Sequence, residues 1–254
     1  MAITIKSERE IELMAEAGKI LERVHNELEK VLHPGMSTKD IDTLGEKIIR
    51  SYGCIPSFLN YNGYPASICV SVNQEVVHGI PDKHRIIHEG DIVSLDAGVI
   101  YKGYHSDAAR THAVGEVSEE AKKLIQVTKE CFFEGIKYAK AGNHLFDISG
   151  AIGRYAEERG YGVVRDLCGH GIGTALHEAP EIPNYEVGRK GVKLRPGMTL
   201  AIEPMINIGT YEVDWLDDDW TVVTRDGSLS AHYENTILIT EGEPRILSLT
   251  CDNE

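Results

Sequence analysis

The sequence predicts an α/β protein of the α+β type, in which two halves, each with two helices and antiparallel strands, surround a central site. Apolar residues recur at helical spacing in four segments, and strand-like runs follow each pair of helices. Both halves also share one order of parts: two helices, a His-Gly-Ile turn at 78–81 or 170–173, and two acidic residues on strands. This repetition is either a coincidence or an internal duplication whose halves, about 1–115 and 116–254, meet face to face.

The first half opens with two predicted helices. The first begins at Ser7, which forms a capping box with Glu10, and it ends at a Pro-Gly pair at 34–35. The second runs from near Ser37 to Tyr52. Strands are then predicted at 67–73, 91–100 and 104–114, with residues 101–103 as the turn of a hairpin.

The second half repeats this order. Helices are predicted from Ser118 to about Ala139, with acidic residues in the first turn, and from about Leu145 to Glu158. Strands follow at 162–165, 198–206, 220–224 and 234–240, and residues 225–227 are predicted to form the turn between the last two.

The predicted hairpin brings two carboxylates together. A two-residue turn at Tyr101 and Lys102 places Asp96 directly opposite Asp107, and a turn centred one residue later makes them diagonal neighbours. In either register their Cβ atoms lie roughly 4.5–8 Å apart on strands that are otherwise apolar. Such a pair is destabilising unless a cation lies between the carboxylates. The alternative is that both aspartates face solvent or pair with Arg110.

Three more residues extend this acidic pair. Glu203 lies inside the apolar segment 199–208, where burial of an unpartnered carboxylate would cost several kcal/mol. Glu234 repeats the situation at the start of an apolar strand, and His170 adds a nitrogen donor from a glycine-rich turn. Four carboxylates and one imidazole suit Mn, Fe(II), Co or Zn. They exceed what one ion requires, so two divalent metal ions per chain are predicted.

With these residues, the sequence closely resembles the type I methionine aminopeptidases, which share the pita-bread fold. The similarity covers nearly the whole chain. Its most specific segments are 61–73 (YNGYPASICVSVN), 76–81 (VVHGIP), 91–115 (DIVSLDAGVIYKGYHSDAARTHAVG), 168–180 (CGHGIGTALHEAP), 195–204 (RPGMTLAIEP) and 220–240 (WTVVTRDGSLSAHYENTILIT). The resemblance implies a single pita-bread catalytic domain over residues 1–254, without an N-terminal extension domain.

The resemblance also implies a function and the residues that carry it. The expected enzyme is a hydrolase that removes the N-terminal methionine from nascent proteins and peptides by two-metal hydrolysis, preferring a small second residue. Glu203 is implied to be the proton shuttle, His177 to donate to the developing oxyanion, and His78 to contact the nitrogen beside the cleaved bond. The implied metal ligands, of which Asp107 and Glu234 bridge the two ions, are Asp96, Asp107, His170, Glu203 and Glu234.

An apolar pocket would select methionine. Besides His78 and His177, the substrate-binding residues implied by the resemblance are Phe58, Tyr61, Tyr64, Cys69, Leu176 and Trp220. In this pocket Cys69 is expected to pack as a soft sulfur and not to act as a nucleophile. The sequence departs from the commonest family pattern at Phe58, Asn62 and Leu176, which leaves the width of the pocket and its inhibitor preference open.

Composition sets the expected partners. A formal charge of −14 at pH 7 argues against nucleic-acid binding, because phosphate binding needs a positive surface. Five cysteines without a CxxC pair indicate reduced thiols in the cytoplasm. The N-terminus does not resemble a signal peptide, and no apolar run approaches about 18 residues, so no membrane association is expected. We expect a monomer that acts on N-terminal Met peptides and nascent chains, with any ribosome contact made by the domain surface.

Other functions predict different sequence features. Proline-specific aminopeptidases on the same fold usually carry a large extra N-terminal domain, whereas the first helix here starts at residue 7. Type II methionine aminopeptidases carry a long insertion in the second half, and no such segment lies between His177 and Glu234. A pita-bread binding module without catalysis would have broken ligands, whereas all five are of acceptable type. The acidic segment 214–220 is typical of a solvated turn; the alternative is a metal or partner site near the substrate mouth.

Overall fold

The four predicted helices are present in the structure, a computed structural model that describes residues 3–249. Their bounds are α1 Glu8–Val31, α2 Thr38–Ser51, α3 Glu119–Ile136 and α4 Leu145–Glu157. Local capping sets where they begin. The Glu10 carboxylate accepts the Ser7 N–H at 2.7 Å, and the Ser118 hydroxyl accepts the Ala121 N–H at 3.1 Å.

The strands of the described residues form four small sheets. One joins β1 (Ile55–Pro56), β2 (Ile68–Val72), β4 (Ile92–Tyr101) and β5 (Tyr104–Ala113). Another joins β7 (Gly169–Gly171), β8 (Glu178–Ile182), β9 (Thr199–Ile202), β14 (Asn235–Leu238) and β15 (Arg245–Ile246). The third contains β6 (Gly162–Val163), β10 (Met205–Asn207) and β13 (Ser230–His232), and the fourth β3 (Glu75–Val77), β11 (Val213–Trp215) and β12 (Val222–Thr224). A short 3-10 turn spans Tyr61–Gly63.

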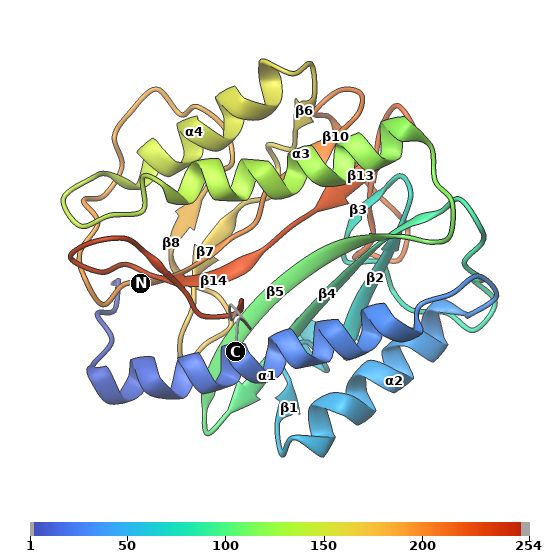
Figure 1. Cartoon of the computed structure of the whole chain (residues 1–254), viewed down its shortest axis with the longest axis horizontal. Helices are drawn as coiled ribbons and strands as arrows, with labels where there is room; N and C mark the ends of the chain where they lie inside the picture. The colour runs from blue at the N-terminus through green and yellow to red at the C-terminus, as the bar shows by residue number, and fades with distance from the viewer. Residues whose placement is uncertain (1–2, 250–254) are drawn as a thin grey trace.

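Each helix pair covers the strands of its own half of the chain. Apolar residues of α1 and α2 form a core with those of β2, β4 and β5. Apolar residues of α3 and α4 form a second core with those of β9, β10, β13 and β14. Figure 1 shows the two helix pairs on opposite sides of the strands. This arrangement has the layered form expected from the sequence, while the internal duplication stays a prediction.

The β4–β5 hairpin has the second of the two predicted registers. Tyr101 pairs with Tyr104, so the turn residues are Lys102 and Gly103, both with positive φ (48° and 86°). Two-residue hairpin turns favour this conformation, and glycine adopts it without a steric penalty. Asp96 therefore pairs with Ala109 and Asp107 with Gly98. The two aspartates are diagonal neighbours, and the prediction that they lie directly opposite each other is wrong.

The strand predicted at 198–206 is interrupted at Glu203 and Pro204. Before the break, β9 pairs with β7 and β14; after it, β10 pairs with β6 and β13. Proline has no N–H to donate to a ladder, so the chain changes sheets here. The strand β13 was not predicted between the 225–227 turn and residue 234, because three residues carry too little periodicity.

Strands β5 and β14 lie side by side in the middle of the molecule (Figure 1). The Glu234 N–H donates to the Ala109 carbonyl at 3.0 Å, and the Ala109 N–H donates to the Glu234 carbonyl at 3.4 Å. We call this contact between residues 107–111 and 232–236 the central seam. It connects the two halves, and it carries Asp107 and Glu234.

Two smaller predictions concern thiols and the acidic segment. Cys54, Cys69, Cys131 and Cys168 are free, and Cys251 lies outside the described residues. Segment 214–220 begins in strand β11, and its residues 216–219 form an exposed turn, as predicted. Trp215 is half exposed at 50%. The Asp218 carboxylate accepts the Thr221 N–H at 2.7 Å. Within residues 3–249 this segment contributes to no group of donors that could hold an ion.

Candidate metal centre

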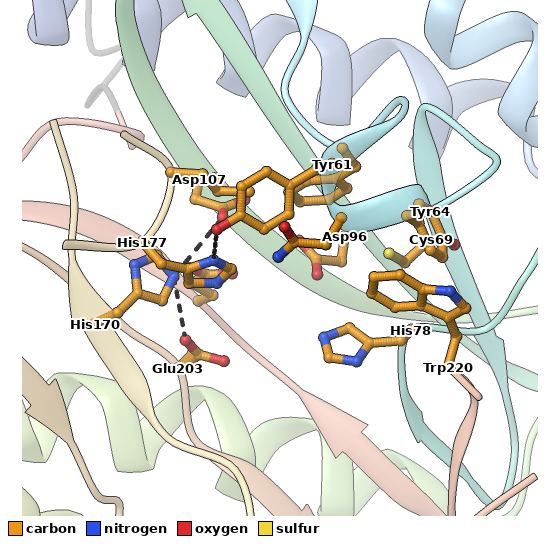
Figure 2. Close-up of a pocket in the computed structure, with 14 residues that line it drawn as sticks. Tyr61, Tyr64, Cys69, His78, Asp96, Asp107, His170, His177, Glu203 and Trp220 are labelled. Atoms are coloured by element: carbon orange, nitrogen blue, oxygen red, sulfur yellow. Dashed lines mark hydrogen bonds and ion pairs between the residues drawn. The ribbon is translucent and has the colours of Figure 1, made fainter. Parts of the chain in front are cut away.

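The five predicted metal ligands line one pocket of about 170 Å³. Figure 2 labels Asp96, Asp107, His170 and Glu203 in this pocket. They come from five separate segments: Asp96 from β4, Asp107 from β5, His170 from β7, Glu203 from the end of β9 and Glu234 from the residue before β14. Both halves of the chain therefore contribute. The break after β9 places Glu203 where the chain leaves one sheet for another.

Asp107, His170 and Glu234 form a compact group of donors. One donor atom from each lies within 4.8 Å of the other two, and all three residues are buried. His170 Nε2 also lies 3.6 Å from Glu203 Oε1. Asp96 lines the same pocket beside this group. The arrangement is compact enough for the carboxylates and the imidazole to hold a metal ion together.

The imidazole of His170 has the protonation that a metal ligand requires. Its Nδ1 lies 2.9 Å from the carbonyl oxygen of Gly171. Because a carbonyl only accepts, Nδ1 must carry the proton. The lone pair is then on Nε2, which faces Asp107 and Glu203 at 4.0 Å and 3.6 Å. Backbone contacts of this kind fix the tautomer and orientation of metal-binding histidines.

The carboxylates show the electrostatic conflict that a cation would relieve. Burial raises the pKa of Asp96 to about 8, and burial followed by repulsion from neighbouring carboxylates raises the pKa of Asp107 and Glu234 well above the ordinary values. One oxygen of each of these three carboxyl groups is buried without a hydrogen-bond partner. Oxygen atoms without partners, together with a neutral imidazole, match the ligands preferred by divalent first-row metals.

Two further histidines lie on different sides of the pocket in Figure 2. His177 Nδ1 lies 2.7 Å from the Tyr61 hydroxyl, and the His177 ring lies 4.2 Å from that of His170, centre to centre. His78 has a left-handed backbone (φ 60°) directly after β3, and burial lowers its pKa to about 4. Both histidines border the pocket, as predicted, without belonging to the compact donor group.

The predicted apolar wall is present on one side of the pocket. The Tyr64 ring contacts the Trp220 ring edge-on at 5.1 Å, and the Tyr64 hydroxyl donates to the Gly79 carbonyl at 2.9 Å. Burial raises the pKa of the Cys69 thiol well above its ordinary value, which is unfavourable for a nucleophile. The predicted lining residues all border the pocket: Phe58, Tyr61, Tyr64, Cys69, Leu176 and Trp220.

Sequence reasoning missed several neighbours of these residues. Asn62 lines the pocket, although it was noted only as a departure from the family pattern. His232 is buried, and its Nε2 lies 3.8 Å from Glu203 Oε2. Residues 232 and 234 share one side of an extended segment, so period-two alternation could have indicated His232. No local signal pointed to Thr111 or Thr236, whose hydroxyls bond across the central seam.

Comparison with known proteins identifies the family of this chain. The sequence model of "Metallopeptidase family M24" matches residues 12–241. The chain belongs to metallopeptidase family M24. This M24 chain is therefore a metal-dependent peptidase, and its family membership implies that it uses a divalent metal.

Similarity within family M24 extends over the whole chain for some relatives. A methionine aminopeptidase from Clostridium acetobutylicum is 58% identical over 247 residues, which cover 97% of this chain and 99% of the relative. The crystal structure of a methionine aminopeptidase from Thermotoga maritima has a TM-score of 0.96 and 47% identity, covering 98% and 100% of the two chains. The fold of this M24 chain is thus that of the methionine aminopeptidases, the pita-bread fold expected from the sequence.

A proline-specific relative matches less well. The structure of an Xaa-Pro dipeptidase from Bacillus anthracis has a TM-score of 0.77 and 27% identity, and this M24 chain covers only 62% of it. The remaining part of that protein has no counterpart in the match.

Across residues 3–249, no helix of this M24 chain combines the length and the apolar character that a membrane crossing requires.

Proposed function

We propose that this enzyme is a type I methionine aminopeptidase, which removes the N-terminal methionine from peptides and nascent proteins. The observation that carries the proposal is that four acids and an imidazole line one pocket together with apolar and aromatic side chains. The identities to methionine aminopeptidases over the full chain support the same activity. A peptidase with this pocket needs an apolar side chain at the substrate's first residue and a hydrolytic centre next to it.

The site would hold two divalent ions, from Mn, Fe(II), Co or Zn. Asp107 and Glu234 would bridge them, with Asp96, His170 and Glu203 completing the ligand set. This assignment is supported by the buried carboxyl oxygens without partners and by the lone pair that His170 directs toward the acids. When bound, the ions supply Lewis-acid activation of a water molecule and of the scissile carbonyl.

Three side chains of the pocket would act on the substrate. If the Tyr61 hydroxyl donates to Nδ1 of His177, then Nε2 carries the proton and donates to the carbonyl oxygen as negative charge develops there. His78 is neutral at pH 7 because burial lowers its pKa, so it contacts the nitrogen beside the cleaved bond without adding charge. The Glu203 carboxylate would accept a proton and return it to the leaving amine.

The apolar wall would recognise the methionine side chain. The Cys69 sulfur and the rings of Tyr64 and Trp220 offer the soft contacts that thioethers prefer. Phe58 and Leu176 differ from the commonest family pattern and would set the width of this wall. A preference for a small second residue is proposed from the similarity to the methionine aminopeptidases.

The remaining assignments follow from the family and the charge of the chain. We assign the enzyme to the cytoplasm, where N-terminal methionine is removed from nascent chains. We also propose that it is a monomer. Its charge of −14 supports the absence of a specific nucleic-acid partner. Any ribosome contact would use the surface of this domain. A peptidase that leaves nascent chains untouched in a translation reaction would contradict this role.

The decisive experiment is peptide turnover by metal-stripped enzyme reconstituted with one metal at a time. Met-Ala-Ser should be cleaved after addition of Co²⁺, Mn²⁺, Fe²⁺ or Zn²⁺, with release of free methionine, whereas Ala-Pro-Ser should not. Asp107→Asn is the matched inactive variant. Cleavage of the proline peptide in preference to the methionine peptide, or metal binding without any turnover, would contradict the proposal.

A further inference from the structure

The central seam contains two threonine hydroxyls that replace backbone hydrogen bonds. At its middle, Ala109 and Glu234 exchange backbone bonds. At one end, the Thr236 hydroxyl accepts the Asp107 N–H at 2.9 Å and donates to the Asp107 carbonyl at 3.0 Å. At the other end, the Thr111 hydroxyl accepts the His232 N–H at 2.9 Å and donates to the His232 carbonyl at 2.9 Å. Each hydroxyl thus satisfies both backbone groups of a residue in the opposite half.

The backbone groups of Thr236 are not available for hydrogen bonds to Asp107, because both have other partners. The Thr236 N–H donates to the Ser248 hydroxyl at 2.9 Å, and the Thr236 carbonyl accepts the Leu247 N–H at 2.8 Å. At Thr236, the backbone of β14 therefore bonds to residues 247–248 and no longer to β5. Thr236 therefore bonds to the backbone of Asp107 through its side-chain hydroxyl.

Water cannot easily take over these bonds. Ser106 and Thr236 are fully buried, and Asp107 is 4% exposed. A buried N–H or carbonyl that loses its partner is costly, so the segment would shift to find another. Any such shift moves the Asp107 carboxylate, because it lies on the same residue.

We propose that Thr236 is a positioning residue of the metal centre, which holds Asp107 in place through both of its backbone groups. The inference rests on the proposed function, in which Asp107 binds both ions. Because Thr236 follows Glu234 by two residues, one short segment carries a proposed ligand and positions another. The two carboxylates proposed as bridges are thereby held at a set separation by the seam.

The test is metal affinity in matched variants. Thr236→Val keeps the volume and removes the hydroxyl, and Thr236→Ser keeps the hydroxyl. Calorimetric titration of metal-stripped protein with Co²⁺ alone should show binding weakened by about 10–100-fold for Thr236→Val. The visible absorption of bound Co²⁺ should change as well. Thr236→Ser should bring the Co²⁺ affinity back to within about threefold of that of the unmodified protein. It should also restore the visible absorption of bound Co²⁺.

Thr38→Val is the control, since the fully buried Thr38 hydroxyl likewise accepts the Asp82 N–H at 2.8 Å and donates to the Asp82 carbonyl at 3.1 Å, and neither residue lines the pocket. It should lower the unfolding midpoint without weakening Co²⁺ binding. Equal weakening by Thr236→Val and Thr38→Val would overturn the proposal, because loss of any such buried pair of hydrogen bonds would then weaken metal binding. Unchanged Co²⁺ affinity in folded Thr236→Val would overturn it too. If the unmodified protein binds no Co²⁺, the proposed function fails instead.

A measurement on the unmodified chain covers the case in which Thr236→Val does not fold. Amide hydrogen exchange of Asp107 should be slow in the metal-stripped protein and should change little when Co²⁺ is added, because Thr236 already occupies this N–H. Rapid exchange that slows only after Co²⁺ addition would mean that metal positions Asp107, and would overturn the proposal.

Discussion

Single atoms decide whether the residues of this pocket can bind a metal. The Gly171 carbonyl holds the proton of His170 on Nδ1, which leaves Nε2 free to coordinate. The same reasoning applies to Cys69, where burial and not sequence context determines the state of the thiol. Two predictions belong to this scale.

Cys69→Ala should retain the turnover number while raising KM. The thiol packs against Tyr64 and is held neutral by burial, so it contributes apolar contact and no covalent chemistry. We expect kcat within about twofold and KM raised by roughly 3–30-fold, as for removal of a small buried group from a binding pocket. Steady-state kinetics on Met-Ala-Ser measures both. Loss of kcat by several orders of magnitude would instead indicate a nucleophilic cysteine.

Asp96→Asn should stabilise the metal-free protein while weakening metal binding. The pKa of this carboxyl rises from an ordinary value of 3.8 to about 8 in the fold, so it destabilises the metal-free fold increasingly as pH rises between these values. Removing the charge should raise Tm at pH 7 by roughly 2–4 °C for each kcal/mol recovered. The gain should shrink toward pH 4. Thermal unfolding of chelator-treated protein measures this gain in Tm. Asp217→Asn, which changes an exposed acid, is the control.

At the scale of elements, the packing of helix α1 depends on a close backbone contact, and the loop before β13 depends on hydrogen bonds to a carboxylate. Helix α1 crosses the C-terminal segment at Gly18, where an added Cβ would lie 1.9 Å from the Leu247 carbonyl oxygen. The loop before β13 depends on Asp226, whose carboxylate accepts the N–H groups of Thr210 and Ser228 at 2.8 Å and 3.0 Å. Each contact supports a prediction.

Gly18→Ala should destabilise the protein although alanine favours helices. Helix propensity favours alanine by about 1 kcal/mol, but overpacking costs typically 1–3 kcal/mol, and backbone atoms cannot rotate away as a side chain can. We expect a net loss of stability in urea unfolding. Gly242→Ala, where an added Cβ meets nothing within 4 Å, should be close to neutral. A gain of stability from Gly18→Ala would show that α1 does not pack as described.

Asp226→Asn should remove a pH-dependent part of the stability. Hydrogen bonds from Ser228 and Thr210 lower the pKa of Asp226 from 3.8 to about 2. Because the folded pKa lies below that of the unfolded chain, this stabilisation is present above pH 3.8 and is lost as pH falls through 2. The variant should therefore be less stable at pH 7 and more nearly equal to the unmodified protein near pH 2. Urea midpoints across this range test the difference.

At the scale of the whole molecule, the metal centre connects the two halves. Asp96 and Asp107 come from the first half, while His170, Glu203 and Glu234 come from the second. Each helix pair has a hydrophobic core, and two further apolar clusters contain residues of both halves. The seam and the proposed ions add polar links to these apolar contacts. Metal binding should therefore affect the stability of the whole fold.

Chelation should lower the thermal midpoint, and added Co²⁺ should restore it. A ligand that binds only the folded chain stabilises it by about 2.7 kcal/mol at one hundred times its dissociation constant. We expect Tm to rise with Co²⁺ concentration in calorimetric scans of the unmodified protein. The rise should be much smaller in Asp107→Asn, which lacks a proposed bridging ligand. An equal rise in both proteins would show that the ions bind elsewhere.

The helices and most of the site were predictable from sequence. Helical periodicity and caps such as Ser7 with Glu10 act within one or two turns, so the local sequence contains them. The four acids that meet in the pocket were predictable because carboxylates in apolar segments need a cation, whatever the fold. Strands of two or three residues, such as β7 and β13, were not, because they exist only through their neighbours in the sheets.

By itself, the sequence determined which residue types must meet: four acids and an imidazole that burial makes unfavourable without a metal. The tertiary structure decided how they meet. Gly103 shifted the hairpin register, Pro204 released Glu203 from its sheet, and Thr236 holds the backbone of Asp107 from the opposite half. The cost of burying a charge is a property of the residue, whereas the direction of a side chain depends on hydrogen bonds to segments far away in the chain.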